Sequence, residues 1–285
     1  MNHAPLAKSR FGLLLAAEQI RYQLLLLLRS PMSTFTAVVI PFIVLMALDI
    51  ATPQAATRHL HHTSYADFLI PAMATFALLN ACYVSTITSV VIAREEGVLK
   101  RLHGTPLPLW AYVVGRIAAS AVVGAAAVFV VLIIGAVVMN TRIGGSRLAD
   151  LIAITALGIV AFTVTGLAVS TLVPRPETAL PVAYGTMLPL AFVSDVFFPA
   201  TAAPTWLRRV AAAFPVEPIA DPAERLFARG AGWPMTAGEV LVVCLWIIAA
   251  GIVTAARFRW EPGVTFLARR ARWHGRRPRR PGVQA

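Results

Sequence analysis

Charged side chains that could engage another surface are concentrated in residues 94–108, which read REEGVLKRLHGTPLP. Glu96 precedes Lys100 by four residues, which is the order and spacing that favour an ion pair along a helix. Gly104 could cap such a helix, and Thr105-Pro106 would prevent its continuation. The pattern predicts a short helix over residues 94–105 whose charges could engage a partner.

The same stretch would have an apolar side, because Val98, Leu99 and Leu102 fall together on a helix. A helix of roughly two to three turns with these two faces, held between two apolar stretches, is well placed to transmit force from a soluble partner. The alternative is a water-facing loop that only sets the membrane topology. Two adjacent glutamates argue against that alternative, because acidic residues contribute little to topological sorting.

Side chains that could catalyse a reaction or bind a metal are sparse elsewhere. His59, His61 and His62 could bind a metal, but a loop cluster without a nearby carboxylate or cysteine is more often a plain loop. The phosphate-binding pattern G-x-x-x-x-G-K-[ST] is absent, and no Ser/His/Asp or Cys/His arrangement gathers at one depth. The sequence therefore predicts that the chain is not an enzyme and binds no metal or cofactor of its own.

Apolar residues make up 58% of the 285 residues and charged residues 13%, which is about half the charged share of soluble domains. The mean hydropathy is +0.73, and several apolar runs exceed the ~20 residues that a helix needs to cross a bilayer. The sequence predicts an all-α membrane protein with six transmembrane helices. The predicted spans cover residues 32–50, 68–93, 109–139, 148–173, 179–198 and 240–256.

Charged residues inside these spans are few. Asp195 is the best candidate for a functional group at membrane depth, although Pro199 follows closely, so Asp195 could instead mark the outer mouth of a span. Arg116 could extend to the cytoplasmic surface. Cys82 and Cys244 lie in apolar stretches and are expected to be packing residues without a disulfide.

Basic residues flank the spans instead of forming a soluble face, so the net charge of +12 does not indicate nucleic-acid binding. With both termini in the cytoplasm, the cytoplasmic segments carry 17 basic residues and the outer segments 7, as the positive-inside rule requires. Residues 1–31 are predicted to form an amphipathic helix in the cytoplasmic interface, and residues 257–285 a basic cytoplasmic tail. The proline-rich stretch 199–238 is predicted to form re-entrant or interfacial half-helices on the outer side.

Residues 94–108 resemble the E-x-G-x-x-[KR]-x-L-x-x-T-P signature of type 2 ABC transporter permeases, the membrane subunits of drug and polysaccharide exporters. The matching residues are Glu95 or Glu96, Gly97, Lys100 or Arg101, Leu102, Thr105 and Pro106. A later stretch is similar to the region between the last two spans of that family. It matches at Pro204, Trp206, Leu207, Pro215 and Arg225, while Phe214 stands where the family often has asparagine.

The resemblance implies a homodimer or heterodimer of permeases in the cell membrane, docked on two copies of a separate ATPase subunit that binds ATP and Mg. It implies that residues 94–105 are the coupling helix, which fits a groove on the ATPase. The implied docking residues are Arg94, Glu95, Glu96, Gly97, Leu99, Lys100, Arg101, Leu102, Thr105 and Pro106. The excess of arginine over lysine, 23 against 2, indicates a GC-rich and bacterial genome.

The resemblance also implies a substrate path at the dimer interface, between the second and fifth spans. The candidate residues there are Asn80, Tyr83, Thr86, Tyr184 and Thr186, together with Asp195. Ordinary hydrogen bonding between helices is the alternative role for each of them. The predicted function is export of a drug, lipid or glycan; an ion-coupled secondary carrier and a membrane scaffold or assembly protein are the alternatives.

Overall fold

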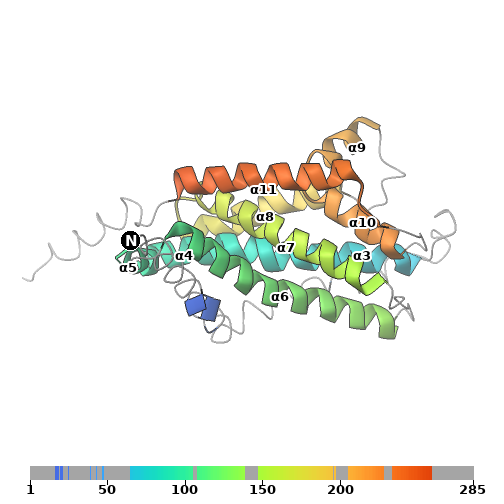
Figure 1. The fold of residues 1–285 in the computed structure, drawn as a ribbon, viewed down its shortest axis with the longest axis horizontal. Helices are drawn as coiled ribbons and strands as arrows, with labels where there is room; N and C mark the ends of the chain where they lie inside the picture. Colours follow the sequence, from blue (N-terminus) through green and yellow to red (C-terminus); the bar gives the residue numbers. More distant parts are fainter. Residues whose placement is uncertain are drawn as a thin grey trace, which may run out of the picture.

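The computed structural model describes residues 65–104, 108–138, 147–194, 196, 205–227 and 233–258, together with single positions between residues 17 and 47. Every regular element in these continuous ranges is a helix, which confirms the all-α class (Figure 1). The predicted interfacial helix over 1–31, the first span over 32–50, the histidine cluster at 59–62 and the tail beyond 258 lie outside the continuous ranges.

In the described part of the chain, four helices are long and apolar enough to cross a membrane, so the chain is a multi-pass membrane protein. They cover Phe68–Glu95, Leu109–Val137, Leu148–Ser170 and Ala237–Arg257 and correspond to the second, third, fourth and sixth predicted spans. The fifth predicted span is α8 (Pro176–Val193), which has 18 residues and is not among the four. Glu177 and the internal residues Pro181 and Pro189 make α8 less apolar than the others.

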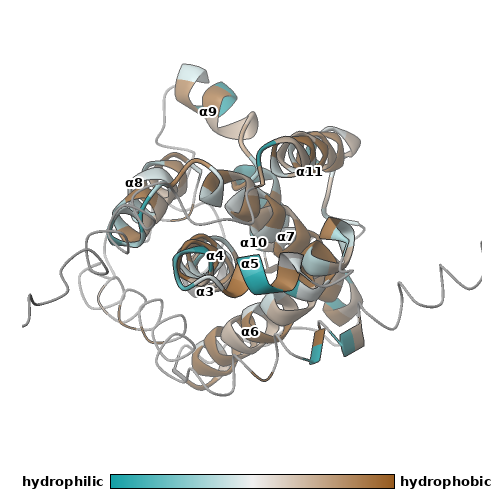
Figure 2. Ribbon diagram, turned by 90° about the vertical axis from the view of Figure 1, so that its left-hand side faces the viewer, coloured by the Kyte–Doolittle hydropathy of each residue, from teal (hydrophilic) through white to brown (hydrophobic). Residues whose placement is uncertain are grey.

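The second span occupies the centre of the bundle and consists of three consecutive helical segments. These are α3 (Tyr65–Leu78), the π-helical segment η2 (Leu79–Val84) and α4 (Ser85–Glu95). Figure 2 shows α3 and α4 end-on, with α6 (Leu109–Val138), α7 (Leu148–Ser170) and α8 around them. All six residues of η2 are buried.

Side chains complete the hydrogen bonding of the π segment. The backbone N–H of Ser85 donates to the Asn80 carbonyl, one residue further back than in an α-helix. The Ala81 carbonyl, which an α-helix would pair with that N–H, accepts the Ser85 hydroxyl at 2.9 Å instead. The Asn80 amide donates to the Phe76 carbonyl at 3.2 Å. The Ala81 carbonyl, which loses its usual backbone donor at the wide turn, is therefore satisfied by the Ser85 side chain inside the membrane.

Small residues let the neighbouring helices approach the second span closely. A Cβ atom added to Gly166 of α7 would lie 3.0 Å from the Tyr83 carbonyl oxygen. A Cβ atom added to Gly124 of α6 would lie 2.9 Å from the Cys82 sulfur. Within lipid, such close contact replaces the hydrophobic effect as the main attraction between helices.

The last helix, α11 (Ala237–Arg257), turns much of its surface outward. Leu241, Leu245, Ile248 and Ile252 are exposed at helical spacing along one side. A soluble protein would bury such a stripe, so its exposure fits contact with the hydrocarbon of the bilayer.

Two short helices, α9 (Thr205–Ala212) and α10 (Glu217–Phe227), follow α8. They lie at the end of the bundle opposite α5 (Val98–His103), as Figure 1 shows. α10 packs on α3 and α7 and buries Ile219, Ala223 and Leu226. From the loop before α7, Arg147 donates to the Leu226 carbonyl at 2.6 Å and caps the last turn of α10. The stretch predicted to hold half-helices therefore contains two short helices among its described residues.

Candidate functional site

The stretch predicted as one helix over 94–105 is divided in two by a turn. α4 ends at Glu95, Glu96 caps it, and Gly97 adopts the left-handed conformation with φ 74° and ψ 12° before α5 begins at Val98. Glu96 and Lys100 are therefore not four residues apart within one helix. Gly104 follows the end of α5, and Thr105 and Pro106 lie outside the described residues.

The apolar side of α5 is fixed to the bundle. Leu99 is 1% exposed and belongs to one buried cluster with Val90 of α4, Tyr112 of α6 and Leu167 of α7, and Leu102 packs against that cluster. Phe258, which follows α11, also packs there, with its ring 5.4 Å from that of Tyr112. Because three spans and the end of a fourth meet under α5, a displacement of α5 would act on all of them.

The opposite side of the turn and α5 presents charge. Glu96, Lys100 and Arg101 are exposed, and we call these three residues the docking face. Glu95 is half-buried beside them. Arg94, which the resemblance also implied in docking, is 8% exposed and donates to carbonyl groups of the α7 terminus, so it does not belong to this face.

Four of the predicted path residues meet between the second span and α8. The Tyr83 and Thr186 hydroxyls share a hydrogen bond of 2.7 Å, and the Tyr184 hydroxyl donates to the Asn80 side-chain carbonyl at 2.9 Å. We call these four residues the inter-span cluster. Asn80 and Tyr83 are buried, whereas Thr186 is exposed on α8, so the cluster reaches from the interior to the surface of the chain.

Thr86, the fifth predicted path residue, turns toward α6 instead. Its hydroxyl accepts from Arg116 Nε at 3.3 Å and lies 3.5 Å from the Ser120 hydroxyl. Arg116 also donates to the Ser85 carbonyl at 3.0 Å. Arg116 is 9% exposed, so the expectation that it extends to the cytoplasmic surface is wrong: its guanidinium is held inside the bundle by the second span.

Asp195 lies outside the described residues. Among the residues that are described, no group of three or more histidine, cysteine or acidic side chains could hold a metal. Cys82 is buried and Cys244 is exposed, and both are free thiols.

Arg225, matched above to the late stretch of the family, joins α10 to the start of α11. It pairs with Asp221 at 2.8 Å and with Glu239, and it donates to the Pro234 carbonyl. Hydrogen bonding to Asp221 raises the pKa of this guanidinium above its ordinary value. Glu239 also completes a capping box with Thr236 at the start of α11. The sequence analysis missed this connection: Thr-x-x-Glu at 236–239 is a pattern from which the cap could have been predicted, but no spacing indicates the partner on α10.

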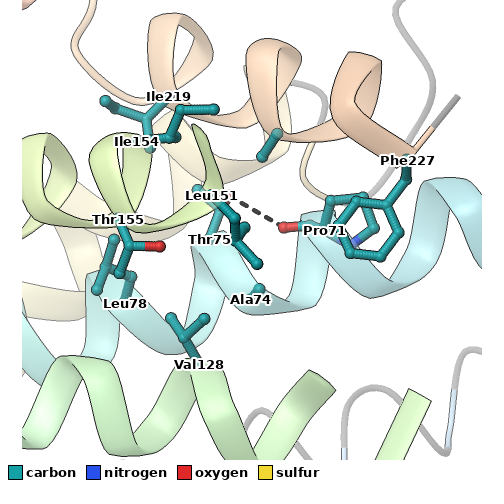
Figure 3. A pocket seen from close by; sticks show the side chains of 11 residues that line it. Pro71, Ala74, Thr75, Leu78, Val128, Leu151, Ile154, Thr155, Ile219 and Phe227 are labelled. Atoms are coloured by element: carbon teal, nitrogen blue, oxygen red, sulfur yellow. Dashed lines mark hydrogen bonds between the residues drawn. The ribbon is translucent and has the colours of Figure 1, made fainter. Parts of the chain in front are cut away.

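A small cavity of about 20 Å³ lies between α3, α6, α7 and α10 (Figure 3). Its lining is mostly apolar, and the Thr75 hydroxyl within it donates to the Pro71 carbonyl at 3.0 Å. A cavity of this size holds about one water molecule at most. It is too small for an organic substrate, so the inter-span cluster remains the better candidate for a substrate path.

Comparison with known proteins identifies the family to which this chain belongs. Residues 19–222 match the family model described as ABC-2 type transporter. The chain is also similar to the probable multidrug ABC transporter permease YbhR of Escherichia coli strain K12 and to its counterpart in Escherichia coli O157:H7, each 24% identical over 199 residues. The match covers 68% of this chain and 53% of each relative, so the chain spans about half the length of the curated relatives it matches. Because the family model covers more than half of the chain, the protein belongs to the ABC-2 type transporter family and is a type 2 ABC permease.

Proposed function

We propose that this chain is the membrane subunit of an ABC exporter that acts as a dimer with six spans per chain and both termini in the cytoplasm. ATP and Mg bind to a separate ATPase subunit, present in two copies, and this chain binds neither. Family membership supports this assignment, and the observation that carries it is α5: a short helix with an exposed charged face and a buried apolar face.

The docking face is the proposed contact with the ATPase. Exposed charges at the rim of an interface steer association and set its register. The buried underside, centred on Leu99, would pass a push on the docking face into α4, α6 and α7. A loop that served only topology would have no need of such an anchor.

The proposed substrate path runs beside the inter-span cluster. α8 packs against α4 and η2 of the second span, and its buried residues form a narrow stripe, Ala179, Ala183, Met187 and Ala191. The two hydrogen bonds of the inter-span cluster add to this contact. Small side chains and two hydrogen bonds make a contact that can open at modest cost. The hydroxyl and amide groups that would then be uncovered suit an amphipathic drug, lipid or glycan. The multidrug name of the relatives supports the first of these classes.

The test is to purify the tagged full chain from its native membrane, to identify a co-purifying ATPase by mass spectrometry and to reconstitute both in nanodiscs. We expect ATP turnover from the complex and none from this chain alone. ATP hydrolysis by the chain alone, or repeated failure to recover an ATPase, would contradict the proposal. Uptake of a fluorescent amphipathic dye into inverted vesicles then tests the direction of transport.

A further inference from the structure

Arg94 is the last basic residue before the turn that leads into α5, yet it is buried. Its NH1 group donates to the Ser170 carbonyl at 3.4 Å, and its NH2 group donates to the Val173 carbonyl. Ser170 is the last residue of α7 and Val173 follows it by three residues, and the two acceptors lie 76 and 79 residues from Arg94 along the chain. The guanidinium therefore joins the end of the second span to the end of the fourth.

The last turn of α7 requires such a donor. The final four carbonyls of a helix have no partner within it. In α7 the Leu167 carbonyl accepts the Ser170 hydroxyl at 2.6 Å, and the Ala168 and Val169 carbonyls accept the backbone N–H groups of Thr171 and Leu172. Arg94 supplies a donor to the fourth, Ser170, and its charge lies at the negative end of the helix dipole.

An apolar contact joins the same two elements independently. Leu99 of α5 and Leu167 of α7 belong to one buried cluster, at 1% and 0% exposure. The end of α4 is thus attached to the end of α7 through Arg94, and α5 is attached to α7 through Leu99. Attachments on both sides of the turn at Gly97 resist displacement of α4 and α5 against α7.

We propose that Arg94 is a positioning residue that makes α4, α5 and α7 move as one unit. A push on the docking face then reaches the fourth span as directly as the second. This inference rests on the proposed function for the source of the push. It differs from a docking role, because the Arg94 side chain faces the bundle instead of the partner.

The experiment compares the full-length variants Arg94→Met, Arg94→Lys and Arg101→Met, with Arg175→Met as the matched control. Arg175 is an exposed arginine just before α8 and belongs to neither the docking face nor the inter-span cluster. We expect Arg94→Met to recover as much ATPase as wild type but to lose about tenfold in ATP turnover per complex, the factor that one charge-assisted hydrogen bond supplies. Arg94→Lys should restore part of the turnover. Arg101→Met should instead reduce ATPase recovery.

A second experiment tests the attachment directly by measuring the distance between α5 and the end of α7. Spin labels at Lys100→Cys and Leu172→Cys, both exposed positions, are introduced after Cys244→Ala. Because Lys100 belongs to the docking face, both distances are measured on the chain alone, without the ATPase. With Arg94 retained the distance between the labels should be narrowly distributed, and with Arg94→Met the distribution should broaden.

Normal turnover and a narrow distance distribution with Arg94→Met would overturn the inference, as would loss of ATPase recovery from a folded Arg94→Met chain. If wild type recovers no ATPase, the proposed function fails instead, and the distance distribution of the chain alone still tests the attachment.

Discussion

At the scale of single residues, the buried polar side chains of the second span form hydrogen bonds with different neighbouring helices. Asn80 and Tyr83 meet α8, whereas Thr86 meets α6. The sequence could place all three on the second span because of its long apolar run. It could not predict that Thr86 faces away from the other two, because the π segment that contains Asn80 and Tyr83 changes the helical register before Thr86, and hydropathy does not reveal such a segment.

The hydrogen bond between Tyr83 and Thr186 should be measurable as a coupling between the second span and α8. Tyr83→Phe and Thr186→Val should each lower the free energy of unfolding by ~0.6 kcal/mol, the average for hydrogen bonds between membrane helices. The double variant should lose no more than one of the single variants, because each change removes the same bond. Unfolding in mixed micelles by titration with SDS gives these values.

Thr165→Val is the control for that cycle, because its hydroxyl bonds within its own helix, to the Ala161 carbonyl at 2.7 Å. The losses in the free energy of unfolding caused by Thr165→Val and by Tyr83→Phe should be additive in the double variant. Additive losses for Tyr83→Phe and Thr186→Val would mean that the two hydroxyls do not interact.

The docking face predicts a defect in ATPase binding for Glu96→Lys. The side chain is exposed, so the reversed charge should not disturb insertion into the membrane. Against a complementary partner it should weaken binding by about tenfold or more, because like charges across an interface are strongly unfavourable. ATPase recovery and turnover measure the effect, and Glu177→Lys, an exposed reversal in the first turn of α8, is the matched control. Normal recovery of the ATPase with Glu96→Lys would contradict the docking role and indicate that residues 94–105 serve only to set the membrane topology.

At the scale of elements, the main difference from expectation is the turn that separates α4 from α5. Charge spacing predicted one continuous helix, and a glycine inside a helix costs only ~1 kcal/mol relative to alanine, so Gly97 alone does not indicate a break. The break is visible only in the backbone, where Gly97 has a positive φ. Among the residues that the structure describes, and apart from the two chain neighbours of Gly97, no atom lies within 4 Å of a Cβ placed there. The backbone conformation therefore explains the glycine.

Substitutions at Gly97 can therefore be ranked by backbone preference. Asparagine enters the left-handed region more readily than alanine, and a β-branched residue enters it least readily. ATPase-dependent turnover should fall least for Gly97→Asn, more for Gly97→Ala and most for Gly97→Val. If close approach of the ATPase were the reason for the glycine, the smaller alanine would be tolerated better than asparagine, and that order would contradict the conformational explanation.

At the scale of the whole molecule, the sequence predicted the spans best where apolar runs are long and bounded by charge or proline. The second, third, fourth and sixth spans appear close to their predicted limits. Composition indicates a span at α8 less clearly, because Pro181 and Pro189 make this helix less apolar. Local sequence patterns could not predict two features: the central position of the second span and the packing of α10 against α3 and α7. Both depend on contacts between residues that are distant in the sequence.

The arrangement predicts that α5 and α9 face opposite sides of the membrane. Lys100→Cys and Trp206→Cys, made after Cys244→Ala, place single exposed thiols at the two ends of the bundle. In intact cells a membrane-impermeant maleimide should label only Trp206→Cys, and Lys100→Cys should react only after the membrane is opened. Labelling of both thiols in intact cells would contradict the orientation derived from the positive-inside rule.

The unequal lengths of the spans determine how far α5 stands from the hydrocarbon. The 28 helical residues Phe68–Glu95 are about 42 Å long at 1.5 Å per residue, whereas the hydrocarbon core of a bilayer is about 30 Å thick. α11, with 21 residues, is about 32 Å long and nearly matches it. The second span therefore has roughly 12 Å to spare, about the depth of the head-group regions of both leaflets together. A thicker bilayer would cover that excess and bring the docking face closer to the lipid, so bilayer thickness would limit how well the proposed ATPase can reach this permease.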